Sequence, residues 1–329
     1  MKTVEYTIHR LRSEEMDDTD RKLLLILYED PRMSIRDIAK KLGMSRQAAH
    51  QRLRALAKAG VFKDMKAAVA NYYLDGVPVL IWGRSNAMSV TKSLNLLGES
   101  ELTQSATVSG GRELCVFGYL RRMSELSDYV DFVRRVAEMP DVTVGFPNFE
   151  DGINPVAYDG GARKESYQKL SPLDLRIIDS LQGNARKPIG DIADEVGASQ
   201  KTVRRHIERM RRGGSLDFDT PLDIPSGEEM VTMVYVTLRK NADIVKAARR
   251  LLRVDPVHFI VLRSFSNIPD LLRGVITSDR MAVIRRIIKE VENDEDVLGV
   301  SPNLIYAERV FDSCWDYDLD KVASVRKET

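Results

Sequence analysis

The stretch that decides the fold is residues 37–60, DIAKKLGMSRQAAHQRLRALAKAG. It predicts two helices joined by a tight turn, because Gly43 can supply the positive φ that a sharp reversal requires. Ser45 follows the turn, and its hydroxyl is suited to cap the second helix by accepting from a backbone N–H. The apolar residues of that helix recur at spacings of four and three and form one stripe: Ala49, Leu53 and Leu56.

The other face of the second helix is polar and basic. Side chains of these types contact phosphates and base edges when a helix lies in the major groove of DNA. We therefore expect a helix-turn-helix that binds double-stranded DNA. Its candidate contacts are Ser45, Arg46, Gln47, His50, Gln51 and Arg54.

The chain then repeats this pattern. Without gaps, Asp20 aligns with Asp174 and Arg32 aligns with Arg186, and the turn glycine and the capping serine also recur. The second recognition helix is more basic than the first, which is the local positive charge that a DNA-binding face needs. Its candidate contacts are Ser199, Gln200, Lys201, Arg204, Arg205 and Arg209.

The first helix of each repeat has its own start signal. Asp17 precedes Asp20 by three residues, and Ser171 precedes Asp174 by three, which is a capping-box-like spacing. Pro172 stands at the first helical position, where its missing N–H costs nothing. The second half is thus predicted to begin its helices as the first half does.

A different pattern follows each helix-turn-helix. Residues 61–70 predict a short strand or wing, and the next segment predicts the order βαββαβ of a ferredoxin-like domain. In the first half the strands are expected at 77–84, 103–108, 114–120 and 141–146, with helices at 87–97 and 124–139. In the second half they are expected at 231–238, 257–263, 271–277 and 297–300, with helices at 243–252 and 280–291.

The predicted fold class is therefore α+β, with two winged helix-turn-helix domains, each followed by a βαββαβ domain. The expected domain bounds are 16–75, 76–150, 170–226 and 227–312, with a Gly-rich linker at 151–169 and a polar tail at 313–329. Two βαββαβ domains in one chain can stack their sheets face to face and leave a crevice for a ligand at their joint.

Composition excludes several other classes of protein. The formal net charge is +1, so a DNA-binding surface must be local. The two cysteines, Cys115 and Cys314, build neither a metal site nor a disulfide framework, and they fit a reducing cytoplasm. No signal peptide or membrane-spanning run is evident. We expect no enzyme activity, catalytic residue, cofactor or metal, and His258 is expected to be a packed side chain.

The motifs above resemble the leucine-responsive/AsnC family of prokaryotic transcription regulators, whose DNA-binding pattern matches residues 20–24, 37–39 and 42–45 and their repeats in the second half. The resemblance covers nearly the whole chain twice, so one chain would supply both halves of a dimer. It implies βαββαβ (RAM-type) domains that self-associate and bind an amino acid or other small effector. The effector candidates are Gly110, Gly111, Glu113, Asn267 and Asp270.

The leading hypothesis is a sequence-specific regulator with an internal pseudo-dimer that reads an asymmetric DNA site, because the two recognition helices differ. The main alternative is a tetrapyrrole enzyme, because siroheme decarboxylases resemble the same fold and use paired copies of it. A third alternative is a module that only senses or oligomerises and does not bind DNA.

Overall fold

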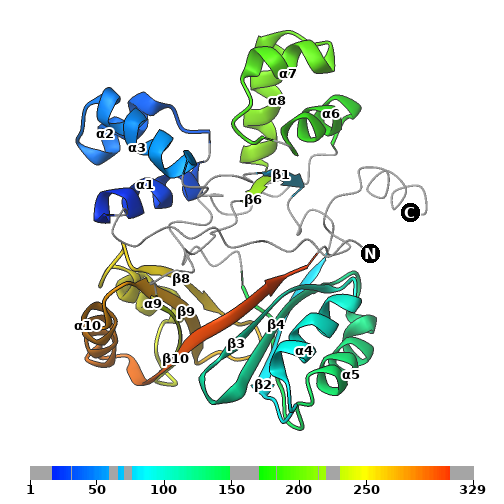
Figure 1. Ribbon diagram of the computed structural model, residues 1–329, viewed down its shortest axis with the longest axis vertical. Coiled ribbons are helices and arrows are strands. Elements are labelled where there is room, and N and C mark those ends of the chain that lie inside the picture. Colours follow the sequence, from blue (N-terminus) through cyan, green and yellow to red (C-terminus); the bar gives the residue numbers. More distant parts are fainter. Residues whose placement is uncertain are drawn as a thin grey trace. The chain divides into compact units, whose positions relative to one another are not determined.

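A computed structural model describes residues 17–30, 32–58, 66–69, 76–148, 170–182, 184–213, 215–219 and 230–311 (Figure 1). These residues form two compact units, a helix-rich unit and a sheet unit, and each unit takes residues from both halves of the chain. The predicted linker, the tail and residues 61–65 of the predicted wing lie outside the described residues. None of the described helices is long and apolar enough to span a bilayer.

The helix-rich unit contains both predicted helix-turn-helix domains. The helices of the first are α1 (Asp18–Glu29), α2 (Ile35–Leu42) and α3 (Arg46–Lys58). Asp17 caps α1 and completes a capping box with Asp20, as the sequence predicted. Gly43 ends α2 with φ 66°, which confirms the left-handed turn. Residues of all three helices form one buried cluster, and the predicted stripe contributes to it through Ala49 and Leu56.

The second domain has the same order, with α6 (Pro172–Gln182), α7 (Ile189–Val196) and α8 (Gln200–Arg212). Pro172 is the first residue of α6, as expected. Gly197 ends α7 with φ 66°, the same angle as in the first turn. This domain has its own core, in which Ile177 and Ile178 of α6 pack against α7 and α8.

Strand β1 (Lys66–Val69) follows the first helix-turn-helix, and β6 (Leu216–Asp219) follows the second. The strand predicted within residues 61–70 is confirmed, but its partner was not foreseen. The two strands pair antiparallel with one another, from Lys66 opposite Asp219 to Val69 opposite Leu216. This two-stranded ribbon therefore connects the two helix-turn-helix domains.

The sheet unit contains the two βαββαβ domains, and both predicted orders are confirmed. The elements of the first are β2 (Val77–Arg84), α4 (Val90–Leu96), β3 (Thr103–Ser109), β4 (Glu113–Leu120), α5 (Leu126–Val136) and β5 (Thr143–Gly145). Those of the second are β7 (Met230–Leu238), α9 (Ile244–Leu252), β8 (Phe259–Ser264), β9 (Leu271–Ser278), α10 (Met281–Glu292) and β10 (Val297–Val310). In each domain both helices pack on the same face of the strands, where the buried apolar side chains gather (Figure 1).

The eight strands form a single sheet in the order β5-β2-β4-β3-β10-β7-β9-β8. Strand β10 has 14 residues, whereas the sequence predicted only four. Its first part pairs with β7 of its own domain, and its last part pairs with β3 of the first domain. The prediction was too short because the second part is held by a strand from the other half of the chain.

The two ends of the sheet also meet. Pro147, just after β5, forms an antiparallel bridge with Phe265, just after β8. The Asn148 N–H donates to the Ser264 carbonyl at 2.9 Å, and the Ser266 N–H donates to the Phe146 carbonyl at 2.9 Å. The sheet thus closes on itself, with the helices outside and a second face turned inward.

The two inward faces pack against one another, as expected for stacked domains. Trp82 of the first domain stacks on Tyr235 of the second, with ring centroids 6.2 Å apart, and also contacts Phe265 at 5.5 Å. Leu80, Trp82, Cys115 and Phe265 form the buried cluster between the two faces.

Candidate nucleic-acid interface

The recognition helix α3 is built as the sequence predicted. The Ser45 hydroxyl accepts a hydrogen bond from the Ala48 N–H at 3.1 Å, which satisfies one of the free donors at the helix start. Ala49 and Leu56 are buried and Leu53 is half-buried, so the apolar stripe faces the core. The predicted DNA contacts of this helix are all exposed: Ser45, Arg46, Gln47, His50, Gln51 and Arg54.

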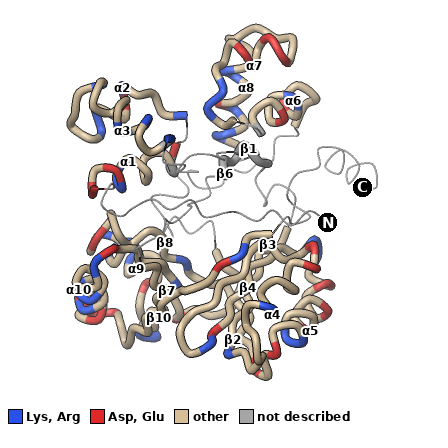
Figure 2. Tube along the Cα trace, in the orientation of Figure 1, with Lys and Arg blue, Asp and Glu red and all other residues tan. Residues whose placement is uncertain are grey.

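The second recognition helix, α8, has the same construction. The Ser199 hydroxyl accepts from the Thr202 N–H at 3.1 Å, and Val203, Ile207 and Met210 form the buried side. Figure 2 shows Lys and Arg repeated along α8. Five predicted contacts on this helix are exposed: Ser199, Gln200, Lys201, Arg204 and Arg205.

The sixth predicted contact, Arg209, has a partner within the domain. Its guanidinium forms an ion pair with Asp174, whose side chain is fully buried at the start of α6. His206 also contacts Asp174, through Nδ1 at 2.7 Å. Burial alone would raise the pKa of Asp174, but the hydrogen bonds from Ser171 and His206 and the charge of Arg209 hold it below the usual value. Arg209 therefore helps to anchor α8 within its own domain, and its role as a DNA contact stays a prediction.

Two more arginines at the end of α8 are engaged within the protein. Arg211 pairs with Asp30 of the first domain at 3.1 Å, and Arg212 lies 3.8 Å from Glu208. Lys201, Arg204 and Arg205 have no ion-pair partner among the described residues. The positive face available to a ligand is thus concentrated in the first half of α8.

In the first domain, a different side chain connects the recognition helix to the carboxylate at the start of the first helix. Arg52 of α3 contacts the carboxylates of Asp17 and Asp20, each at 2.8 Å. In the repeat alignment Arg52 corresponds to His206 and Asp20 to Asp174. The carboxylate at the start of the first helix therefore anchors the recognition helix in both domains.

The two helix-turn-helix domains are also joined by a reciprocal contact that the sequence analysis missed. The Arg32 guanidinium donates to the carbonyls of Ala185 and Lys187, the latter at 2.8 Å, and Arg186 donates to the Met33 carbonyl at 3.2 Å. Burial, and then the nearby charge of Arg186, lower the pKa of Arg32. The sequence did contain one signal for this contact. An arginine occupies the equivalent position in both repeats, as Arg32 and Arg186, and it does not belong to the apolar pattern of either repeat.

The predicted effector residues lie in the sheet unit, and the side chains of two of them form hydrogen bonds within it. Glu113 accepts a hydrogen bond from the Tyr235 hydroxyl at 2.8 Å, across the two domains. Asn267 accepts from the Phe146 N–H at 2.9 Å and donates to the Val144 carbonyl at 2.8 Å, so it helps to close the sheet. Gly110 and Gly111 form the turn between β3 and β4, with Gly111 at φ 67°, and Asp270 directly precedes β9.

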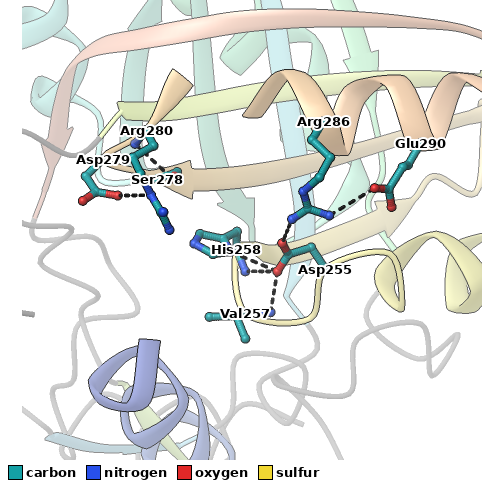
Figure 3. A network of polar contacts seen from close by, with 8 residues as sticks. All are labelled: Asp255, Val257, His258, Ser278, Asp279, Arg280, Arg286 and Glu290. Carbon is teal, nitrogen blue, oxygen red and sulfur yellow. Dashed lines mark hydrogen bonds and ion pairs between the residues drawn. The ribbon is translucent and has the colours of Figure 1, made fainter. Parts of the chain in front are cut away.

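The predicted packing of His258 is confirmed, because its side chain is buried at the start of β8. Its Nδ1 lies 3.0 Å from Asp255 Oδ1, and Asp255 is also paired with Arg286 of α10 (Figure 3). Burial would raise the pKa of Asp255, but its contacts with His258 and Arg286 keep it below the usual value. No cluster of three or more metal-ligating side chains occurs among the described residues.

A family model described as winged helix-turn-helix DNA-binding matches residues 16–63 and 170–214. The chain is 26% identical over 145 residues to the HTH-type transcriptional regulator AldR of Mycobacterium tuberculosis, covering 42% of this chain and 78% of AldR. It is 24% identical over 132 residues to the HTH-type transcriptional regulator LysM of Sulfurisphaera tokodaii, covering 40% of this chain and 91% of LysM.

Among solved structures, the siroheme decarboxylase NirDL is similar with a TM-score of 0.57, covering 94% of this chain and 100% of that chain at 12% identity. At this identity the likeness extends to the tandem fold alone. The sequence relatives, the two winged helix-turn-helix matches and the paired βαββαβ domains agree with the resemblance stated from the sequence. These findings support the resemblance of the chain to the leucine-responsive/AsnC family of transcription regulators, and the two winged helix-turn-helix matches are consistent with a tandem duplication.

Proposed function

We propose that this protein is a sequence-specific regulator of transcription that binds double-stranded DNA as an internal pseudo-dimer. One observation carries the proposal: a single compact unit holds two capped recognition helices whose polar faces are exposed. In an ordinary family dimer two chains would supply these helices, whereas here one chain supplies both.

The two helices would read different half-sites. The first offers Arg46, Gln47 and His50 near its start, whereas the second offers Gln200, Lys201 and Arg204. Arg and Gln side chains at the start of a recognition helix can form bidentate hydrogen bonds with guanine and adenine edges. The preferred operator is therefore asymmetric.

The same proposal includes a small effector that binds the sheet unit, and self-association through the βαββαβ domains. It places the protein in the cytoplasm, where a prokaryotic regulator meets its DNA. AldR and LysM, to which the chain is similar, are both named HTH-type transcriptional regulators.

Binding to the DNA upstream of the protein's own gene, measured across a salt series, tests the DNA-binding function. Each phosphate contact lowers the slope of log K against log salt by about 0.9. The Arg204→Ala/Arg205→Ala variant should bind more weakly, with a slope shallower by about 2. Arg176→Ala, an exposed change on α6, is the matched control and should behave as the wild type. Absence of binding even at low salt would contradict the proposal.

Selection from a random duplex library tests the asymmetry. The expected product is a site with two unlike half-sites. Recovery of perfect palindromes would show that the two helices read the same sequence, and the asymmetric part of the proposal would then fail.

The likeness to NirDL along nearly the whole chain supports a second candidate, a tetrapyrrole enzyme. Absorption spectra separate the two functions. A tetrapyrrole-binding protein titrated with an iron uroporphyrin should develop a saturable, shifted Soret band, whereas a dedicated regulator should leave the spectrum of the free compound unchanged.

A further inference from the structure

The outer face of β10, on which the helices pack, contains exposed apolar side chains. Val300 and Ala307 pack against the cores of the second and first domains. Because side chains alternate along a strand, Leu304 shares this face with Val300, yet it is 43% exposed. Tyr306, at the bulge of β10, is 61% exposed. Figure 1 shows β10 running between the helix pair of the second domain and that of the first, so neither pair covers this part of the strand.

A third exposed apolar side chain lies at the same end of the second domain. Met281 begins α10 and is 47% exposed. Strand β9 ends three residues before Met281, opposite the start of β7, and the start of β7 also lies opposite Leu304 and Ile305. Single exposed apolar side chains are ordinary, whereas a group of them favours contact with another segment or molecule.

Positive charge lies on both sides of this apolar group. Arg309 of β10 donates from Nε to Asn95 Oδ1 of α4 at 3.4 Å, and Lys92 lies one turn before Asn95 on the same helix. Arg285 lies one turn after Met281, so these two side chains share one side of α10. None of the three cations forms an ion pair with a residue that the structure describes. The surface therefore suits a segment that is both apolar and acidic.

The chain that follows β10 has this chemistry. Phe311 packs on the outer face against the core of the first domain, and its N–H donates to the Gln104 carbonyl at 2.8 Å. Residues 315–320 read WDYDLD, a strict alternation that gives an extended segment one apolar side and one acidic side. Residues 312–314 begin with Asp and Ser, two residue types that favour turns.

We propose that the chain reverses after Phe311 and that residues 315–320 bind along the outer face of β10. Their apolar side contacts Leu304 and Tyr306, and their aspartates lie near the cations of α4 and α10. Six extended residues span about 20 Å, enough to reach from Arg309 back to Leu304. Both edges of β10 are already paired, with β7 and β3, so the segment binds through side chains and not as an added strand. It thereby keeps this apolar face from other molecules.

Trp315 reports on this contact. The chain has two tryptophans and Trp82 is buried, so subtracting the signal of Trp315→Phe from that of the full chain isolates Trp315. Acrylamide quenching of Trp315 is compared with that of a free peptide of residues 312–320, which is exposed to solvent. In the protein, Trp315 should be quenched less and should emit at shorter wavelength, at every protein concentration. The degree of protection gives the equilibrium constant between the bound and the free segment.

Leu304→Asp places a negative charge on the apolar face and should lower this equilibrium constant by about tenfold. Met123→Asp, a change of the same kind at an exposed position before α5, is the matched control and should leave it unchanged. Lys92→Glu should lower it by about twofold, because exposed ion pairs contribute little, and Lys240→Glu after β7 should have no effect. If Leu304→Asp does not fold by circular dichroism, Tyr306→Ser replaces it and should also lower the constant.

Three results would overturn the proposal. They are quenching of Trp315 equal to that of the peptide, protection that the folded Leu304 or Tyr306 variant leaves unchanged, and protection that increases with protein concentration. The last result would mean that the segment binds a second copy of the chain. Because no DNA is present in these measurements, the proposed function would stand in each case.

Discussion

At the scale of single residues, Asp174 shows how a recognition helix is positioned. Its buried carboxylate receives hydrogen bonds from Ser171 and His206 and an ion pair from Arg209, so it connects the start of α6 to α8. The first domain performs the same task with Asp20 and Arg52. Sequence reasoning recognised the aligned aspartates as helix-start signals, but the second role of each carboxylate depends on a helix 32 residues further along the chain.

Replacing Asp174 should therefore be costly. Asp174→Asn removes the charge but leaves His206 and Arg209 near a buried neutral group, so unfolding free energy should fall by on the order of 3 kcal/mol. Asp179→Asn, an exposed change on the same helix, should have little effect. Thermal unfolding followed by circular dichroism measures both, and equal midpoints for the two variants would contradict the assigned role.

The same group predicts a dependence on pH. The folded-state pKa of Asp174 lies below its ordinary value of 3.8, so the stabilisation it provides is present above that value and is lost as pH falls through the folded pKa. The wild type should thus lose stability below about pH 4. In thermal scans across this pH range, the stability of Asp174→Asn should fall less than that of the wild type. If the stability of both proteins falls equally with pH, other carboxylates cause the loss of stability in acid.

At the scale of elements, the turns between helices depend on glycine backbone geometry. Gly197 ends α7 at φ 66°, and a Cβ added there would meet no atom within 4 Å. The only cost of a side chain at this position is backbone strain. Gly190, in contrast, lies within α7, where alanine is compatible with the helix.

These two glycines form a matched pair. Gly197→Ala should lower the unfolding free energy by about 1–2 kcal/mol because alanine must adopt the left-handed region. Gly190→Ala should raise it by about 0.5–1 kcal/mol because alanine loses less backbone entropy in a helix. Chemical denaturation measures the free energy of unfolding of each variant. If both variants change this free energy in the same direction, backbone conformation does not account for the effects.

The contact between the two helix-turn-helix domains is also a property of elements. Arg32 and Arg186 donate to backbone carbonyls of the opposite domain, and Ala185 is buried against the core of the first domain. Together with the β1–β6 ribbon, these contacts hold the two recognition helices in one arrangement. The distance between half-sites on DNA should then be fixed rather than adjustable.

Arg32→Ala should loosen that arrangement. It leaves the carbonyls of Ala185 and Lys187 without their donors, which costs about 1–3 kcal/mol if they stay buried. In binding assays with duplexes that differ only in half-site spacing, the wild type should prefer one spacing and the variant should discriminate less. Arg176→Ala is the control with an unchanged preference. If Arg32→Ala prefers the same half-site spacing as strongly as the wild type, other contacts must set the distance between the two recognition helices.

At the scale of the whole molecule, the sheet unit is closed by contacts between the two halves of the chain. Asn267 completes the closure, because its amide accepts from the Phe146 N–H and donates to the Val144 carbonyl. The resemblance suggested Asn267 as an effector contact, and its amide is engaged in structural hydrogen bonds instead. Any effector role would require these bonds to break or to be shared.

Asn267→Ala should open this end of the sheet. The Phe146 N–H loses its acceptor, so its amide hydrogen should exchange faster, and unfolding free energy should fall by about 1–3 kcal/mol. Hydrogen exchange read by mass spectrometry localises the effect to the segment around β5. Asn241→Ala, an exposed change before α9, is the control. Unchanged protection near β5 would show that the Pro147–Phe265 bridge closes the sheet alone.

The sequence by itself determined the elements, their order and the duplication. Helix caps, turn glycines and the periods of apolar residues depend on neighbours a few positions away, so they can be read directly from the chain. The recognition helices and their exposed faces follow from the same local signals, with Arg46 and Lys201 as examples. These local patterns also sufficed to indicate the resemblance to the leucine-responsive/AsnC family, which the comparisons support.

Only the tertiary structure decided which charged side chains are available for DNA and where the two halves join. Arg209 and Arg211 resemble Arg204 and Arg205 in sequence, yet their guanidinium groups pair with Asp174 and Asp30. The length of β10 and the β1–β6 ribbon arise in the same way. Each depends on a partner more than 30 residues away, and the local pattern of a helix or strand carries no information about such a partner.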